Sequence, residues 1–162
     1  MTHITRKFIA AAFVSTILSV SAHAATLNIH NGGDPTSLDP QKISGDWENR
    51  IDGDIFEGLV TEDPKDNPIP GQAASWTISP DQKVYTFKLR DGIKWSDGQP
   101  VTAQDFVFAF QRLMDPKTAA QYAYLQYTIH NAEKINKGEI KDLTQLGVKA
   151  IEIYQKRDIL GQ

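Results

Sequence analysis

Apolar and polar residues alternate most regularly near the middle of the chain, over residues 83–90. Tyr85, Phe87 and Leu89 fall on one face of an extended chain, and the residues between them fall on the other. This segment therefore predicts a half-buried strand. A shorter alternation over residues 26–30, which an Asn-Gly-Gly break follows, predicts a first strand.

Helical spacing begins after Asp46, a residue type that suits the N-cap position of a helix. Four apolar residues then recur along one predicted helical face: Ile51, Ile55, Phe56 and Leu59. Gly53 lies inside this pattern and weakens it slightly. The proline-rich segment 63–71 predicts a turn between elements, since it is short for an interdomain linker.

A second helix is predicted at Thr102, because an acidic residue, Asp105, stands three positions later. Asp115 followed by proline predicts its end. Its expected apolar face consists of Phe106, Phe110 and Leu113. Two further elements are predicted near the end of the chain, a short helix over residues 131–137 that stops at Gly138 and a strand over residues 146–151.

The first 24 residues predict a secretory signal peptide. A basic start at Arg6 and Lys7 precedes an apolar run over residues 8–20, and Ala22-His23-Ala24 has the small-residue pattern of a cleavage site. The run is shorter than the roughly 20 residues that span a bilayer. The alternative is a buried first helix, but such a helix would carry polar residues at helical spacing.

Composition excludes several classes of protein. The chain has no cysteine, which excludes disulfides, thiolate metal sites and cysteine nucleophiles. A net charge of -3 gives no electrostatic case for binding nucleic acid. No motif for a hydrolase, a zinc protease, a phosphate loop or an EF-hand occurs, and His30 and His130 are isolated. The sequence therefore predicts no enzyme, no metal and no cofactor.

The three tyrosines Tyr122, Tyr124 and Tyr127 leave two interpretations open. Their side chains could be partly buried in the core, which their spacing alone favours. They could also line a ligand cleft, because tyrosine offers an apolar face together with a hydroxyl.

The stretch 73–107, with Trp76, Trp95 and the Asp97-Gly98 turn, resembles the signature of the extracellular solute-binding proteins of peptide and nickel ABC transporters. Residues 33–40 and 54–59 resemble the opening segment and the first helix of that family. Residues 115–123 and 146–151 are similar to its oligopeptide-binding branch in particular.

The resemblance implies an α/β fold of the type II periplasmic-binding-protein class, in which two lobes close over a ligand. Only part of the first lobe is expected here. The implied organisation is a signal peptide at 1–24, the N-terminal part of the solute-binding domain at 25–151, and a divergent tail at 152–162. Because the tail departs from the family pattern, it suggests a frameshift, a premature stop or a gene fragment.

The resemblance also implies the substrate-binding component of an oligopeptide importer, monomeric at full length, that delivers peptides from the periplasm to an inner-membrane ABC permease. Ser44, Gly45 and Asp46 match the segment whose backbone pairs with the bound peptide, and Tyr122 matches a tyrosine of the ligand cleft. Without the second lobe, we expect the chain alone to bind peptides weakly, because closure of two lobes normally removes the ligand from water.

Three other functions remain to be weighed. Within the family, the cargo could instead be dipeptides, murein peptides, nickel chelates or haem. Outside it, the chain could be a small exported interaction module without transport activity. An exported hydrolase is the weakest alternative, since no arrangement of nucleophile and base supports it.

Overall fold

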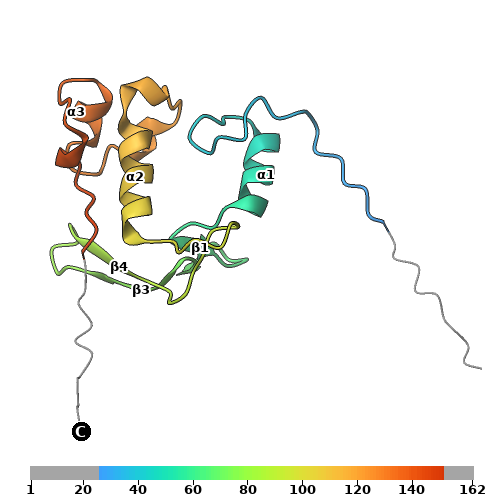
Figure 1. The fold of residues 1–162 in the computed structure, drawn as a ribbon, viewed down its shortest axis with the longest axis horizontal. Helices are drawn as coiled ribbons and strands as arrows, with labels where there is room; N and C mark the ends of the chain where they lie inside the picture. Colours follow the sequence, from blue (N-terminus) through green and yellow to red (C-terminus); the bar gives the residue numbers. More distant parts are fainter. Residues whose placement is uncertain (1–25, 152–162) are drawn as a thin grey trace, which may run out of the picture. The chain divides into compact units, whose positions relative to one another are not determined.

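The computed structural model describes residues 26–151, shown as a coloured ribbon in Figure 1. The predicted signal peptide and the divergent tail lie outside these residues. Residues 31–151 belong to one unit of the chain, and residues 26–30 belong to a separate N-terminal unit. The strand predicted over residues 26–30 is wrong, since this segment has no regular structure. A strand needs backbone partners, and the ladders among the described residues join other segments.

Three α-helices and four strands make up residues 31–151. The helices are α1 (Asp46–Ile55), α2 (Ala103–Met114) and α3 (Ala132–Asn136), and the strands are β1 (Val60–Glu62), β2 (Pro68–Pro70), β3 (Ala73–Ile78) and β4 (Tyr85–Leu89). Three short 3-10 helices follow α2: η1 (Pro116–Thr118), η2 (Ala123–Gln126) and η3 (Leu143–Gln145). No helix in the described part of the chain is long and apolar enough to cross a membrane.

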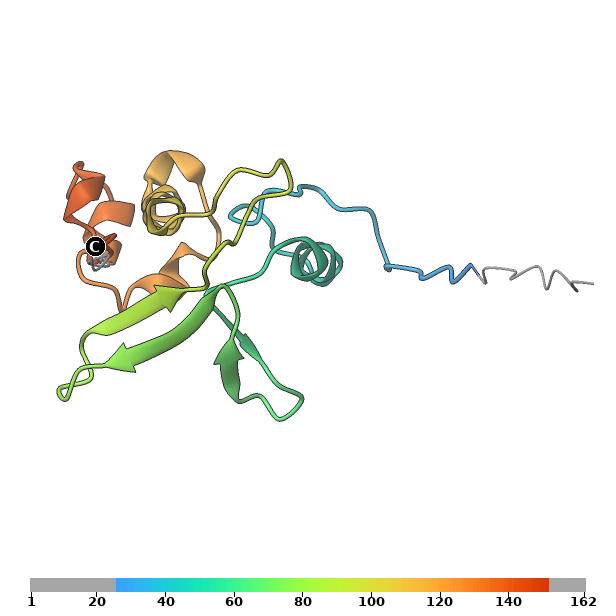
Figure 2. The ribbon, with the colours of Figure 1, turned by 60° about the horizontal axis from the view of Figure 1, so that its bottom comes forward.

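The strands form two separate antiparallel hairpins, β1–β2 and β3–β4, both visible in Figure 2. Strand β4 confirms the prediction over residues 83–90, and Phe87 and Leu89 are half-buried while Tyr85 is exposed. The sequence analysis missed strand β3, although apolar and polar residues alternate from Ala74 to Ile78. The register of β3 against β4 shifts between Ala73 and Ser75.

Helix α2 begins where the sequence predicts. The amide and hydroxyl of Thr102 both donate to the Asp105 carboxylate, at 2.7 and 2.8 Å. The helix ends at Met114, immediately before Asp115, as predicted. Its buried side chains are Val107 and Met114, whereas the face predicted from Phe106, Phe110 and Leu113 is only half-buried. Helix α3 and the positive φ of Gly138 (76°) confirm the short third helix and its stop.

The hydrophobic core lies among α2, α3 and the 3-10 helices, which together we call the helical cluster (residues 103–148). Its five buried members are Met114, Ala123, Ala132, Ile135 and Leu146. The strand predicted over residues 146–151 is wrong, since this segment is irregular. Leu146 packs into the helical core, and the Gly147 amide donates to the His130 carbonyl at 2.9 Å. These contacts hold the start of the segment against the helices.

Helix α1 differs from its prediction at both ends. Gly45 occupies the N-cap in an extended conformation, and Asp46 is the first helical residue. At the other end the helix stops at Ile55, so Leu59 lies beyond it. The Leu59 carbonyl accepts the Ala73 amide at 3.0 Å, which directs the chain into the hairpins. Tertiary hydrogen bonding thus overrides the apolar periodicity that extends to Leu59.

Candidate functional site

The segment Ser44–Gly45–Asp46, which we call the ligand loop, leads directly into helix α1. Its position depends on Glu48, a residue of the first helical turn whose side chain is 2% exposed. The Glu48 carboxylate accepts the amides of Gly45 at 2.7 Å and Ser44 at 3.2 Å. Its other oxygen accepts the amide of Thr36 at 2.7 Å and also the Thr36 hydroxyl. One carboxylate therefore joins the ligand loop to the segment before it.

These four donors explain the electrostatics of Glu48. The hydrogen bond from the Thr36 hydroxyl, followed by those from the backbone amides of Thr36, Gly45 and Ser44, lowers the Glu48 pKa from 4.5 to about 2. The position near the N-terminus of α1 also favours a negative charge. Glu48 is thus ionised at neutral pH, as an acceptor of four donors must be.

Tyr122 brings the second predicted site segment to the ligand loop. Its hydroxyl donates to the Ser44 carbonyl at 3.3 Å, across 78 positions of sequence. The side chain of Tyr122 is 44% exposed, and its ring lies 6.1 Å from that of Tyr124. The fold therefore places the predicted residues next to one another, although they lie on separate elements.

Space around Gly45 in the ligand loop is tight. A Cβ atom on Gly45 would lie 3.0 Å from a Glu48 carboxylate oxygen and 3.1 Å from the Trp47 ring. Gly33 lies against the other part of the same ring, with a Cβ position 3.5 Å from it. The Trp47 indole thus lies against two glycines, a contact that the sequence pattern does not predict.

A second tether connects this region to helix α2. Arg112 donates to both carboxylate oxygens of Asp39, at 2.8 and 2.6 Å, and to the side-chain oxygen of Gln41 at 2.7 Å. Gln41 in turn donates to the Ala109 carbonyl at 2.7 Å. The Arg112 guanidinium lowers the Asp39 pKa to about 2, and the same pair raises the Arg112 pKa. The turn that precedes the ligand loop is therefore fixed to the helical cluster.

Sequence reasoning missed Asp39, Glu48 and Arg112. Glu48 left a detectable signal, since a small residue three positions before a glutamate is the spacing of a capping box. The pair of Asp39 and Arg112 left none, because its members are 73 positions apart. Only the fold brings them together.

The three tyrosines divide between the two interpretations. Tyr127 is half-buried, packs against the core cluster, and donates to Asn136 at 2.7 Å, so it has a structural role. Tyr122 and Tyr124 are exposed, and Tyr122 contacts the ligand loop while Tyr124 lies next to the Tyr122 ring. The core interpretation therefore fits Tyr127, and the cleft interpretation is compatible with the other two.

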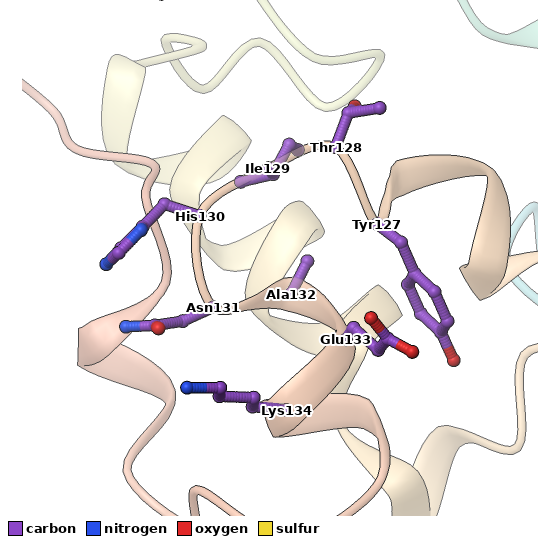
Figure 3. Close-up of a pocket in the computed structure, with 8 residues that line it drawn as sticks. All are labelled: Tyr127, Thr128, Ile129, His130, Asn131, Ala132, Glu133 and Lys134. Carbon is purple, nitrogen blue, oxygen red and sulfur yellow. The ribbon is translucent and has the colours of Figure 1, made fainter.

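A hollow of about 280 Å³ lies elsewhere, lined by residues 127–134, and Figure 3 shows its side chains. All of its lining comes from one continuous segment, and none comes from the ligand loop. Two of its polar groups already have partners, since the Asn131 side chain donates to the Gln145 carbonyl at 2.9 Å and the His130 carbonyl accepts the Gly147 amide. We therefore do not place the ligand site there.

Acidic and histidine side chains do not gather into a metal site within residues 26–151. Asp52 is the one described carboxyl whose pKa is raised, by desolvation and then by the nearby charge of Asp39. The nearby acid Asp54 is exposed. Asp52 is therefore a carboxyl with a raised pKa, and no hydrogen bond within residues 26–151 joins its side chain to a base or nucleophile that would make a reaction centre.

Comparison with known proteins gives consistent results. Residues 67–155 match the profile of the bacterial extracellular solute-binding proteins, family 5. The periplasmic oligopeptide-binding protein OppA of Salmonella typhimurium is 45% identical over 94% of this chain, which covers 31% of OppA. The periplasmic murein peptide-binding protein MppA of Escherichia coli is 44% identical over 84% of this chain and 25% of its own length.

A solved structure shows that the similarity extends to the backbone fold. The crystal structure of Haemophilus influenzae OppA in complex with the peptide RPPGFSPFR is 48% identical, with a TM-score of 0.71 over 75% of this chain and 24% of that one. The chain thus spans less than a third of the length of these relatives. Over that part, its backbone follows theirs.

Proposed function

Because this chain belongs to family 5 of the bacterial extracellular solute-binding proteins, we propose that it contributes one wall of an oligopeptide site in a receptor for ABC import. The fold is part of the first lobe of a type II periplasmic-binding-protein-like architecture. The family binds solutes and is not a class of enzymes. The observation that carries the proposal is the contact between Tyr122 and the Ser44 carbonyl, which joins the two predicted ligand segments.

The ligand loop offers the polar groups that an extended peptide needs. The Ser44 carbonyl has a second lone pair besides the one that Tyr122 occupies. The amide of Asp46, the first residue of α1, has no helical carbonyl to pair with. An acceptor and a donor two residues apart can pair with a peptide main chain regardless of its side chains. This pairing would give affinity for peptides of varied sequence.

The exposed tyrosines would complete this wall. Tyr122 presents an apolar ring face for a peptide side chain, and its hydroxyl donates a hydrogen bond to the Ser44 carbonyl of the ligand loop. A single wall leaves most of a peptide in water, whereas ligand sites normally bury the greater part of their ligand. We propose that strong binding requires the remaining sequence that the longer relatives carry.

The location of the protein follows the same reasoning. OppA and MppA are named as periplasmic proteins. We propose that residues 1–24 direct export, that residues 25–151 are the part of the solute-binding domain present here, and that residues 152–162 diverge from it. An inner-membrane ABC permease would then receive the peptide, and the full-length receptor would act as a monomer.

A chimera tests this proposal. Residues 26–151 would replace the matching segment of Haemophilus influenzae OppA, and RPPGFSPFR would be titrated by calorimetry. We expect binding within about tenfold of the parent protein, and a loss of about tenfold on Tyr122→Ala. Thr128→Ala, an exposed position away from the ligand loop, should change affinity by less than about twofold. A folded chimera that gives no binding heat would overturn the proposal.

Murein peptides are the second candidate ligand, because the similarity to MppA is nearly as high as that to OppA. The same chimera, titrated with a murein tripeptide, separates the two. A stronger response to the tripeptide than to RPPGFSPFR would favour the murein peptide.

A further inference from the structure

We propose that Glu48 is a positioning residue for ligand binding, which fixes the two loop amides inward so that the Ser44 carbonyl faces Tyr122 and the ligand. The consequence for binding rests on the proposed function above. The geometric part rests on hydrogen bonds within the chain and can be tested separately.

The directions of two successive amides carry the argument. Ser44 and Gly45 both donate to the same Glu48 oxygen, at 3.2 and 2.7 Å. In a regular strand, successive amides point to opposite sides. The carboxylate therefore imposes a local geometry that strand pairing alone would not give. It turns both donors of this residue pair toward the protein interior.

The carbonyls of the same two residues then have distinct roles. The Gly45 carbonyl accepts the Asn49 amide at 3.0 Å and so belongs to the first turn of α1. The Ser44 carbonyl accepts Tyr122 instead. Within this pair of residues, Ser44 is thus the one that presents a main-chain acceptor outside the helix. Without Glu48, the two amides would lose the partners that hold this acceptor in place.

A carboxylate fits this position better than any other side chain. All four groups that face it are donors, namely three amides and the Thr36 hydroxyl. An ionised carboxylate is purely an acceptor and can take four hydrogen bonds, whereas a glutamine would turn an NH2 group toward some of these donors. A buried charge is tolerated here because each oxygen is fully partnered.

Apolar packing does not replace the hydrogen bonds that Glu48 makes to the ligand loop. Ile43, immediately before the ligand loop, is 7% exposed and anchors its entrance. Ser44 is exposed, and the apolar neighbour of Gly45 is the Trp47 ring, which is itself 39% exposed. The positions of both residues therefore depend mainly on hydrogen bonds, namely those to Glu48, the one from Tyr122 and the one from the Asn49 amide to the Gly45 carbonyl.

Nuclear magnetic resonance of the full 162-residue chain tests the geometric part. Glu48→Gln should raise the exchange rates of the Ser44 and Gly45 amides at least about tenfold, since each loses a charged acceptor. The Ile135 amide in the core should keep its exchange rate. Asp54→Asn removes the same charge from an exposed position on the same helix and serves as the control. Unchanged Ser44 and Gly45 amides in Glu48→Gln would overturn the inference.

Peptide binding in the chimera tests the functional part. Glu48→Gln should weaken binding of RPPGFSPFR about tenfold, Glu48→Asp should weaken it less, and Asp54→Asn should change it by less than about twofold. Glu48→Asp keeps the charge, so it remains informative if Glu48→Gln does not fold. Equal affinity in all variants would overturn the inference and leave the proposed function standing. If the chimera with Glu48 intact does not bind the peptide, the proposed function is overturned. The exchange rates of the Ser44 and Gly45 amides would then still test whether Glu48 holds these two amides.

Discussion

The helical cluster and the two hairpins differ sharply in how they bury apolar side chains. In the helical cluster, the five side chains of the buried core are at most 2% exposed. In the hairpins, the large apolar side chains of Ile69, Ile78, Val84 and Tyr85 are 38–58% exposed. A helix satisfies its own backbone and can pack against near neighbours, whereas an isolated two-stranded hairpin is marginally stable in water.

The difference shows that a region can resemble the family closely in sequence and still bury few apolar side chains. The family match over residues 67–155 spans both regions. The hairpins and the turn segment after them contribute many of the family's recognisable residues, including Trp76 and Trp95, but the helical cluster holds most of the buried core. We therefore expect the cluster to dominate the free energy of unfolding.

The strongest test of this comparison is a cavity in the cluster. Met114 is fully buried, so Met114→Ala should lower the free energy of unfolding by about 2–5 kcal/mol. Ile78→Ala removes a side chain of similar size from the β3–β4 hairpin and should cost less than about 1 kcal/mol, because Ile78 is 48% exposed. Urea denaturation followed by circular dichroism measures both. Equal losses of unfolding free energy in the two variants would contradict the expectation that the helical cluster contributes more stability than the hairpins.

A close backbone contact at Gly71, between the two hairpins, is an exception to this division. A Cβ atom on Gly71 would lie 2.5 Å from the Gly58 carbonyl oxygen, so Gly71→Ala should cost about 1–3 kcal/mol. Gly53→Ala is the matched control in α1, where nothing lies within 4 Å of the added atom. It should stabilise the protein by about 0.5–1 kcal/mol, because alanine is the better helix former. Thermal unfolding of the two variants should shift in opposite directions.

Acid should weaken the hydrogen bonds of Glu48 to the ligand loop and the ion pair of Asp39 with the helical cluster. The pKa values of Asp39 and Glu48 are lowered to about 2 in the folded protein, from 3.8 and 4.5. Their stabilisation is therefore present above the unfolded values and is lost as the pH falls from about 5 to about 2. The Asp39 share is on the order of 1 kcal/mol after allowance for its partial exposure. The raised pKa of Asp52 acts in the opposite direction.

Urea midpoints measured from pH 7 to pH 2 test this dependence. The double variant Asp39→Asn, Glu48→Gln should show a flatter profile than the original chain, because it lacks the two carboxyls whose pKa values folding lowers to about 2. A profile as steep as that of the original chain would show that other carboxyls cause the acid sensitivity.

The smallest effect on stability is expected at the hairpin surface. Val84→Lys adds a charge at a position that is 58% exposed, so the free energy of unfolding should change by less than about 0.5 kcal/mol. Self-association should nevertheless decrease, because exposed apolar hairpins favour edge-to-edge contacts and a lysine opposes them. Sedimentation velocity at several concentrations measures this change, and Thr86→Lys on the paired strand β4 controls for added charge alone. Equal decreases in both variants would show that charge, and not loss of apolar surface, is the cause.

Elements with strong local signals were predictable from the sequence. The capping pair Thr102 and Asp105 marks the start of α2, the alternation through Phe87 marks β4, and Gly138 marks the end of α3. Elements that depend on partners were not. Leu59 continues a helical pattern but pairs with the hairpins, and the segment after Leu146 alternates but packs against helices.

The candidate site shows the same division. The sequence by itself determined the family and pointed to Ser44, Gly45, Asp46 and Tyr122, because these lie in segments whose residues resemble those of known relatives. Only the tertiary structure placed Tyr122 on the Ser44 carbonyl, surrounded Glu48 with four donors and joined Arg112 to Asp39. Hydrogen bonds of this kind require donors and acceptors within about 3 Å, and residues far apart in sequence meet this requirement only after the chain has folded.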